Sequence, residues 1–137
     1  MRLFLKCFTF WHILFYRLTG GFIGAYTGKY PMALVTVKGR KSGKWRTVPL
    51  GFMPDGDRFI LIASYGGSPK HPAWYLNLSA NPQVRVQFKR KRMTMRARVA
   101  AGEERSRLWA LALTFYNYDR YQRRTTREIP VVVLEQM

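Results

Sequence analysis

Residues 64–82, SYGGSPKHPAWYLNLSANP, bring together a glycine turn, a histidine, an amide and several prolines. Gly66 and Gly67 lack a Cβ, so the backbone can adopt positive φ there and let a flat or bulky group approach its amides. Because Pro72 suits the first turn of a helix, we predict a short helix that stops just before Pro82. This stretch suits the binding of a planar ligand. A plain connector between two strands is the alternative.

The short predicted helix carries a mixed face. Trp74, Asn77 and Leu78 are spaced i, i+3, i+4, so an aromatic ring, an amide and an aliphatic group lie on one side. Such a face could support a ligand ring. Equally, Trp74 and Leu78 could belong to the core while Asn77 caps a loop, and the spacing leaves both interpretations open.

A second candidate site is the basic stretch 38–49, KGRKSGKWRTVP, in which five basic residues flank a Ser-Gly turn between two expected strands. Such a turn directs backbone amides and cationic side chains at one point, which favours an anion. The stretch lacks the spacing of a P-loop, and no helix begins there. A solvated hairpin tip that is basic for solubility is the alternative.

The third candidate is the aromatic stretch 115–124, FYNYDRYQRR. Tyr118 and Tyr121 are three residues apart, so a helix would place both hydroxyls on one face. Buried tyrosines normally need a partner for the hydroxyl group. The pair could therefore contact a substrate, or it could simply pack a helix end.

Composition narrows the class of protein. The chain has 137 residues, of which 47% are hydrophobic and 15% aromatic, so a disordered chain is excluded and one domain with its own core is expected. The formal net charge of +17 predicts an anionic partner: nucleic acid, an acidic membrane surface or a polyanionic small molecule. Cys7 is the single cysteine, and no Cys/His cluster has metal-ligand spacing. We therefore predict no disulfide, no metal and a reducing cytoplasmic location.

The basic residues are clustered as well as numerous. No acidic residue precedes Asp55, and residues 85–98 contain seven basic and no acidic residues. The basic residues of 85–98 alternate with Val, Phe and Met that we expect to face the core. A surface that binds single-stranded nucleic acid would instead expose aromatic rings for stacking. We therefore expect no nucleic acid among the partners.

Residues 2–18, RLFLKCFTFWHILFYRL, form the first predicted element, an amphipathic helix. Its polar residues share one stripe at helical spacing, and Leu, Phe, Trp and Ile lie opposite. The run is too short for a bilayer span, which needs about 20 apolar residues. It suits a helix in the interface of an anionic membrane, on the inner face of the cell membrane. Packing on the domain or on a second subunit is the alternative, which leaves oligomerisation open. The polar stripe consists of Arg2, Lys6, Thr9, Tyr16 and Arg17.

The chain after the first helix is predicted to be mostly strands. A glycine-rich connector follows the first helix, so we divide the chain into residues 1–30, helix and connector, and residues 31–137, a single domain. A further helix is expected over residues 103–115, with acidic residues in its first turn. Six β-rich runs with two or three inserted helices predict an antiparallel barrel of the α+β class. The six runs are 33–39, 45–53, 58–63, 84–88, 93–100 and 129–134.

In chain order, these motifs resemble a known family, the deazaflavin (coenzyme F420)-dependent nitroreductases and quinone reductases. The resemblance implies a split β-barrel of the FMN-binding type with an N-terminal amphipathic helix. It covers nearly the whole chain. Two positions depart from the family pattern: Tyr65 stands where relatives often have lysine, and Phe115 stands where a related nitroreductase has tyrosine. The matching segments are 16–21, 39–43, 46–50, 63–64, 66–67, Lys70, 72–78, 80–82, 121–122 and 129–131.

The resemblance implies hydride transfer from reduced F420, an 8-hydroxy-5-deazaflavin with a phosphate and a poly-glutamate tail, to a quinone-like or nitroaromatic acceptor. FMN is the less favoured cofactor, and a non-catalytic cofactor or lipid carrier is the alternative function. Ser64, Tyr118 and Tyr121 would hydrogen-bond the acceptor or relay its proton. The residues implied to bind the coenzyme are Arg40, Lys41, Ser42, Gly43, Arg46, Thr47, Pro49, Ala63, Ser64, Tyr65, Gly66, Gly67, Lys70, Pro72, Trp74 and Asn77.

Overall fold

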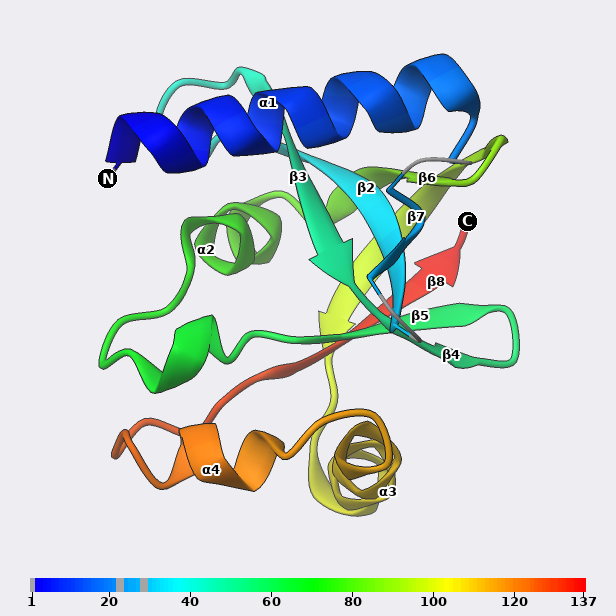
Figure 1. The fold of residues 1–137 in the computed structure, drawn as a ribbon. Helices are drawn as coiled ribbons and strands as arrows, with labels where there is room; N and C mark the ends of the chain where they lie inside the picture. The colour runs from blue at the N-terminus through cyan, green and yellow to red at the C-terminus, as the bar shows by residue number, and fades with distance from the viewer. Residues whose placement is uncertain (1, 22–23, 28–29) are drawn as a thin grey trace.

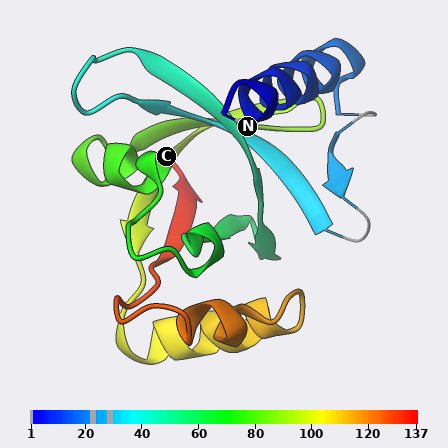
Figure 2. The same cartoon turned by 60° about the vertical axis from the view of Figure 1, so that its left-hand side comes forward.

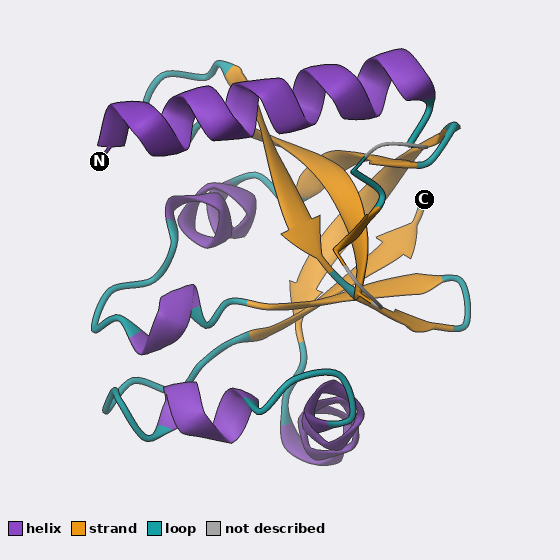
Figure 3. Ribbon diagram, in the orientation of Figure 1, coloured by secondary structure: helices purple, strands orange, loops and turns teal. Residues whose placement is uncertain are grey.

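The computed structural model describes residues 2–21, 24–27 and 30–137. Within them, the helices are α1 (Arg2–Thr19), α2 (Ala73–Ala80), α3 (Gly102–Leu113) and α4 (Tyr118–Gln122), and a short 3-10 helix, η1, spans Tyr65–Gly67. The strands are β1 (Tyr26–Thr27), β2 (Tyr30–Lys38), β3 (Trp45–Gly51), β4 (Met53–Asp55), β5 (Arg58–Ile62), β6 (Gln83–Phe88), β7 (Lys91–Val99) and β8 (Val131–Gln136). Figures 1 and 3 show these elements, with α1 on one side of the sheet and α3 and α4 on the other.

The described strands form one antiparallel sheet in the order β1-β2-β6-β7-β8-β5-β4, and β3 also pairs with β2. The chain passes from β3 to β4 within one residue, Phe52, although β3 and β4 pair with opposite ends of the sheet. The sheet is therefore curled into a barrel. The predicted α+β split barrel is confirmed.

Residues 45–53, predicted as one strand, are two strands that meet at a corner. Leu50 still pairs with Ala33 of β2, whereas Met53 pairs with Ile60 of β5. Between them, Phe52 is buried and stacks on Phe59, with ring centroids 4.3 Å apart. The prediction of a single strand was wrong because the chain changes partner strands at this buried ring.

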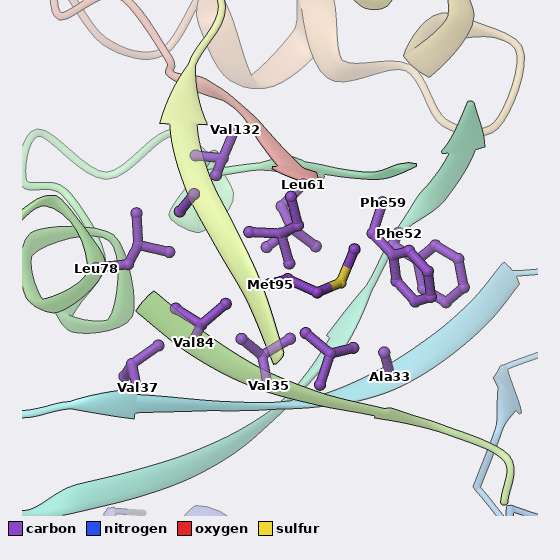
Figure 4. Packing of buried hydrophobic residues seen from close by; sticks show 13 residues of the cluster. Ala33, Val35, Val37, Phe52, Phe59, Leu61, Leu78, Val84, Met95 and Val132 are labelled. Atoms are coloured by element: carbon purple, nitrogen blue, oxygen red, sulfur yellow. The ribbon is translucent and has the colours of Figure 1, made fainter. Parts of the chain in front are cut away.

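The barrel interior is filled by alternate residues of the strands, as period-2 spacing requires. Ala33, Val35 and Val37 of β2 point inward and meet Met95 of β7, while Leu78 of α2 closes one end (Figure 4). On the other side of the sheet, α3 packs through Leu108 and Ala112 on Ile60, Val131 and Val133. These two clusters contain most of the buried hydrophobic residues, and burial of apolar surface is the main stabilising term.

Ion pairs hold the first turn of α3 to the sheet. The Glu104 carboxylate accepts hydrogen bonds from Arg98 at 2.5 Å and from Arg58 at 3.4 Å. The Arg98 guanidinium lowers the pKa of Glu104 to about 2, so this carboxylate stays charged at any ordinary pH.

Helix α1 packs on the outer face of the sheet through Tyr16, which is fully buried with Leu34 and Ala25. The Tyr16 hydroxyl lies 2.9 Å from the carbonyl oxygen of Met32 and accepts the Lys89 amide N–H at 2.8 Å. Tyr16 was predicted on an outward polar stripe, and that placement was wrong. The Met32 carbonyl of β2 and the Lys89 N–H of the β6–β7 turn meet at this buried point, and the hydroxyl pairs with both.

The outward face of α1 is apolar. Phe8, Trp11, Phe15 and Leu18 are spaced i, i+3, i+7, i+10, and each is at least 43% exposed. No helix in residues 2–21, 24–27 and 30–137 is long and apolar enough to cross a membrane. The helix therefore has one face packed in the fold and one apolar face that stays exposed in the described structure.

Tyr16→Phe should lower the free energy of unfolding by about 1 to 3 kcal/mol, because removal of the hydroxyl leaves the Lys89 N–H and a carbonyl without a hydrogen bond. Urea unfolding followed by circular dichroism measures the change. Tyr26→Phe is the matched control, since Tyr26 is 51% exposed. Equal stability of the Tyr16→Phe variant and the wild-type protein would contradict a structural role for this hydroxyl.

Candidate functional site

The predicted site segments follow one another down one side of the molecule: the turn 39–44, then α2, η1 and α4. Figure 2 brings this side forward and shows that order. The turn is joined to α2 by hydrogen bonds between Arg40 and Asn77. The loop at η1 packs on α4. The approach is so close that a Cβ added to Gly67 would lie only 2.7 Å from the Tyr121 carbonyl oxygen. Segments far apart in the sequence therefore form one continuous surface.

The β2–β3 turn is compact and cationic. Its backbone closes with a 2.7 Å hydrogen bond from the Gly39 N–H to the Lys44 carbonyl, and Ser42 Oγ accepts the Lys44 N–H at 3.1 Å. Gly43 has φ +69°, a conformation that suits glycine. In the described residues, no carboxylate pairs with a basic side chain of this turn or with Arg46. These exposed cations are available for an anion.

Helix α2 holds this turn in place. The Asn77 side chain is 6% exposed, and its Oδ1 accepts hydrogen bonds from Arg40 Nη1 at 2.8 Å and the Arg40 N–H at 3.1 Å. Trp74 packs against the barrel core, Leu78 is 2% exposed, and Pro72 precedes the first turn, as predicted. The structure therefore favours the core interpretation for Trp74 and Leu78. Asn77 positions Arg40.

Strand alternation separates the predicted residues of β3. Arg46 lies opposite Val37 and shares the face of β3 that carries Val48 and Leu50, toward the core and α2. Thr47 and Pro49 fall on the other face. There Thr47 Oγ1 lies 2.8 Å from Thr36 Oγ1 and accepts a hydrogen bond from Arg17 of α1 at 3.0 Å. The structure does not bring Thr47 and Pro49 to the side of Arg46.

The glycine turn exposes its backbone. Tyr65 is 60% exposed at φ +45°, and Gly66 has φ +63° with nothing within 4 Å of the place of a Cβ. Gly67, at φ +80°, is buried, and a Cβ there would lie 2.8 Å from the Arg124 Cβ. Gly66 therefore faces open space, where a flat group can approach the backbone. Gly67 is required for packing on α4.

Arg127 organises this loop, although it lies outside every candidate site predicted from the sequence. Its guanidinium donates hydrogen bonds to the carbonyl oxygens of Ser64 at 2.8 Å, Ser68 at 2.9 Å and Ala63 at 3.2 Å. It also lies 3.1 Å from His71 Nδ1. Burial and the nearby Arg127 charge lower the pKa of His71, so Nδ1 of the neutral ring can accept this bond. One side chain therefore fixes the loop from Ala63 to His71.

An aromatic cavity of about 220 Å³ lies between the β3–β4 corner and α4. Tyr118 lines it, and burial raises the pKa of Tyr118 to about 12. Among the described residues, no hydrogen-bond partner is found for the Tyr118 hydroxyl. The cavity thus contains a protonated phenol that is free to donate. Its lining residues are Tyr30, Met32, Gly51, Phe52, Met53, Tyr116 and Tyr118.

Tyr121, the second predicted hydroxyl, does not line this cavity. It is hydrogen-bonded to Tyr116 at 2.9 Å between hydroxyl oxygens, and the two rings stack with centroids 5.4 Å apart. The hydrogen bond to Tyr116 raises the pKa of Tyr121. The Tyr118 ring packs edge-on to both. Tyr116, which the sequence analysis did not select, therefore connects Tyr121 to the cavity.

The other predicted residues of the loop lie close by. Ser64 is partly buried, and its Oγ makes no hydrogen bond within the helix cap. Lys70 is exposed. No group of three or more His, Cys, Asp or Glu side chains in the described ranges could hold a metal ion. The groups on this surface are therefore cations, backbone amides and tyrosine hydroxyls, which bind and orient ligands.

Comparison with known proteins gives the same family from sequence and structure. Residues 10–136 match the F420H(2)-dependent quinone reductase family. An F420H(2)-dependent quinone reductase of Mycobacterium tuberculosis is 39% identical over 128 residues, which cover 90% of this chain and 86% of the relative. A second, putative F420H(2)-dependent quinone reductase of that species is 39% identical over 76% of this chain and 88% of its own length.

Solved structures support the same fold and family. The structure of an F420-H2 dependent reductase (FDR-A) superposes with TM-score 0.71 at 46% identity, covering 77% of this chain and 94% of the other. HutZ, a heme storage protein of Vibrio cholerae, shares the fold alone, with TM-score 0.59 at 13% identity over 77% of this chain and 81% of HutZ. The chain therefore belongs to the F420H(2)-dependent quinone reductase family.

Proposed function

We propose that this protein is an oxidoreductase that reduces a quinone with hydride from F420H2, and that the surface from the β2–β3 turn to α4 is its active site. The main support is the juxtaposition of three features in a chain of this family. These are the cations of the turn, which have no carboxylate partner among the described residues, the open backbone at Gly66, and the aromatic cavity, where the Tyr118 hydroxyl has no described hydrogen-bond partner. The family's named reductant favours F420 over FMN as the cofactor.

The residues present fit the coenzyme's anionic groups. Lys41 and Arg46 are exposed and have no carboxylate partner among the described residues, and Asn77 holds Arg40 beside them. We assign these cations to the phosphate and poly-glutamate tail. The backbone at Gly66 would lie against the ring system, because no side chain blocks the approach. Reduced F420 supplies a hydride when bound, and the protein supplies orientation and shelter from water.

We assign the cavity to the acceptor. A protonated phenol in an apolar surrounding is a hydrogen-bond donor suited to a quinone carbonyl, whose oxygen gains negative charge as the ring is reduced. Tyr118 would donate that hydrogen bond. The Tyr121–Tyr116 pair would relay a proton from solvent to this region, and Ser64 would contact the acceptor from the loop side. A nitroaromatic compound would use the same donor through its nitro oxygens.

Tyr118→Phe should lower turnover by about 10²-fold or less, at the low end of general acid–base effects, because solvent can partly replace the hydroxyl. Tyr121→Phe and Ser64→Ala should have smaller effects, since Tyr121 reaches the cavity only through Tyr116. The measurement is steady-state oxidation of reduced F420 with a quinone and with a nitroaromatic acceptor. Because burial raises the pKa of Tyr118 to about 12, wild-type turnover should show no alkaline loss from this group until the pH nears that value.

Coenzyme affinity should hardly change in Tyr118→Phe and Tyr121→Phe, because the cationic turn is elsewhere, and Tyr26→Phe is the matched control. A wild-type protein that binds F420 but oxidises it with neither acceptor would favour the carrier function over the reductase. Full turnover in all three variants would keep the reductase and refute the roles assigned to these residues.

We also propose that α1 docks peripherally on an anionic membrane on the cytoplasmic side, which would bring the site to an apolar quinone. The support is the exposed stripe of Phe8, Trp11, Phe15 and Leu18 in a chain with a net charge of +17. Arg17 adds a basic residue in the last turn of the helix. Docking would bury this stripe, which is otherwise exposed in the single chain.

Trp11→Ser and Leu18→Ser should each weaken binding to acidic liposomes by about 10- to 100-fold, because each removes about 1.5 to 3 kcal/mol of apolar burial. Point substitutions are preferable to deletion of α1, since Tyr16 is part of the fold. Co-sedimentation measures the effect, with Leu113→Ser, an exposed position on α3, as the control. If the wild-type protein does not bind such liposomes, and is a dimer that these same substitutions convert to a monomer, the stripe is an interface with a second copy.

A further inference from the structure

A groove of about 440 Å³ lies on the outer face of the sheet, beside the end of α1 and away from the site described above. The segments that form it are the last turn of α1 and the strands β2, β6 and β7, which lie together in Figure 1. Three arginines from three different elements line it, together with hydroxyl and amide side chains. The lining residues are Arg17, Leu34, Thr36, Arg85, Val86, Gln87, Arg92, Met93 and Thr94.

Strand register places the polar side chains of this groove in rows. Thr36 of β2 lies opposite Arg85 of β6, which lies opposite Thr94 of β7. Gln87 lies opposite Arg92 in the neighbouring row. Side chains alternate between faces, so these residues share the outer face while Val84, Val86 and Met95 fill the core. The groove is therefore lined by hydrogen-bond donors from adjacent strands.

Two of the three arginines are held in place. Arg17 donates a 3.0 Å hydrogen bond to Thr47 Oγ1, and Thr47 is itself 2.8 Å from Thr36 Oγ1. The guanidinium of Arg85 lies over the Trp45 ring, 4.2 Å from its centroid. These contacts hold two guanidinium groups in the lining of one groove without neutralising either. Less conformational entropy is then lost when a ligand binds.

No acidic side chain is among the described residues that line the groove. The acids that form ion pairs are Asp55, Glu104, Glu128 and Glu135, and none of them pairs with Arg17, Arg85 or Arg92 in the described part of the chain. Like charges gathered without a counter-charge repel one another, and an anion among them relieves that repulsion. Planar guanidinium forks and threonine hydroxyls match the tetrahedral oxygens of a phosphate group.

We propose that this groove binds a phosphate group, and specifically the headgroup of an anionic phospholipid. The lipid source is favoured because Arg17 belongs to the helix whose other face carries the exposed stripe of Phe8, Trp11, Phe15 and Leu18. A headgroup in the groove and an apolar stripe in the acyl region would then engage one leaflet together. Nucleic acid is disfavoured, since the Arg85 guanidinium already lies over one face of Trp45, the aromatic ring next to the groove, where a base would have to stack.

The proposal rests on the membrane docking of α1 but not on the reductase activity, so the two can fail separately. The experiment compares the full-length wild type with the double variant Arg85→Gln, Arg92→Gln. The control variant is Arg123→Gln, because Arg123 is exposed after α4, on the opposite side of the sheet. Binding is measured to vesicles of phosphatidylcholine with and without phosphatidylglycerol. Backbone amide shifts are recorded with sodium phosphate and with sodium chloride at equal ionic strength.

The double variant should bind phosphatidylglycerol vesicles about 30-fold more weakly, from about 1 kcal/mol for each arginine near the anionic surface. Arg123→Gln should match the wild type, and the charge-preserving double variant Arg85→Lys, Arg92→Lys should retain most of the binding. Phosphate, and not chloride, should shift the amides of Thr36, Arg85 and Thr94 in the wild type. Oxidation of reduced F420 by a water-soluble quinone should be equal in all variants.

Three results would overturn the proposal. Weakening by Arg123→Gln of about 5-fold, the share of one charge in the effect of the double variant, would mean diffuse charge attraction without a site. Phosphate-specific shifts with unchanged vesicle binding in the double variant would mean a soluble phosphate-bearing ligand and not a lipid. The third result is that a single-stranded oligonucleotide binds the wild type but not the double variant, while the wild type does not bind vesicles. The groove would then be a nucleic-acid surface.

Discussion

Arg127→Met should weaken F420 binding by about 10²-fold or more while the barrel remains folded. The Arg127 guanidinium hydrogen-bonds the carbonyls of Ala63, Ser64 and Ser68 and contacts His71. Hydrogen bonds to a charged group contribute about 1.5 to 3 kcal/mol each, so loss of two or more costs on the order of 3 to 6 kcal/mol. Most of this cost should appear as loss of the ordered conformation of the loop 63–71, because the contacts of Arg127 lie there and not in the barrel core.

Fluorescence titration with oxidised F420 measures the affinity, and thermal unfolding measures the global effect. Arg127→Lys should be intermediate, since an ammonium group cannot reproduce the planar fork that reaches several carbonyls. Arg123→Met is the matched control, because Arg123 is exposed in the same segment. A folded Arg127→Met protein with wild-type affinity would remove the loop from the coenzyme site.

The double variant Lys41→Ala, Arg46→Ala should weaken F420 binding by about 10²- to 10⁴-fold. The estimate takes about 1.5 to 3 kcal/mol for each hydrogen bond to a charged group, with the lower end for these exposed side chains. Salt should also weaken wild-type binding, since exposed ion contacts are screened over about 8 to 10 Å. Turnover at saturating coenzyme should change little, because the acceptor cavity is lined by other residues.

The control is Lys91→Ala, Arg96→Ala, which removes the same charge from exposed positions of β7. Affinities are compared at low and at high ionic strength. A Lys41→Ala, Arg46→Ala protein with wild-type affinity at low salt would show that the turn is a solvated hairpin tip, the alternative left open by its sequence.

The sequence by itself determined the local features. Alternation of apolar residues predicted the strands, Pro72 and Pro82 bounded α2, and the glycine pair predicted positive φ at Gly66 and Gly67. These predictions hold because each depends on backbone sterics and side-chain period within a few residues. The family was recognisable for the same reason, since its motifs are short and contiguous.

Tertiary structure decided which groups meet. Arg127 fixes a loop some sixty residues earlier in the chain, Tyr16 pairs with backbone groups of β2 and of the β6–β7 turn, and Thr47 turns away from Arg46 toward α1. The cavity at Tyr118 exists because the sheet changes direction at Phe52 and brings β3 and β4 over α4. Such contacts depend on how the whole sheet curls and closes. Local propensity fixes the face on which a side chain lies, but the curvature of the barrel selects its partner.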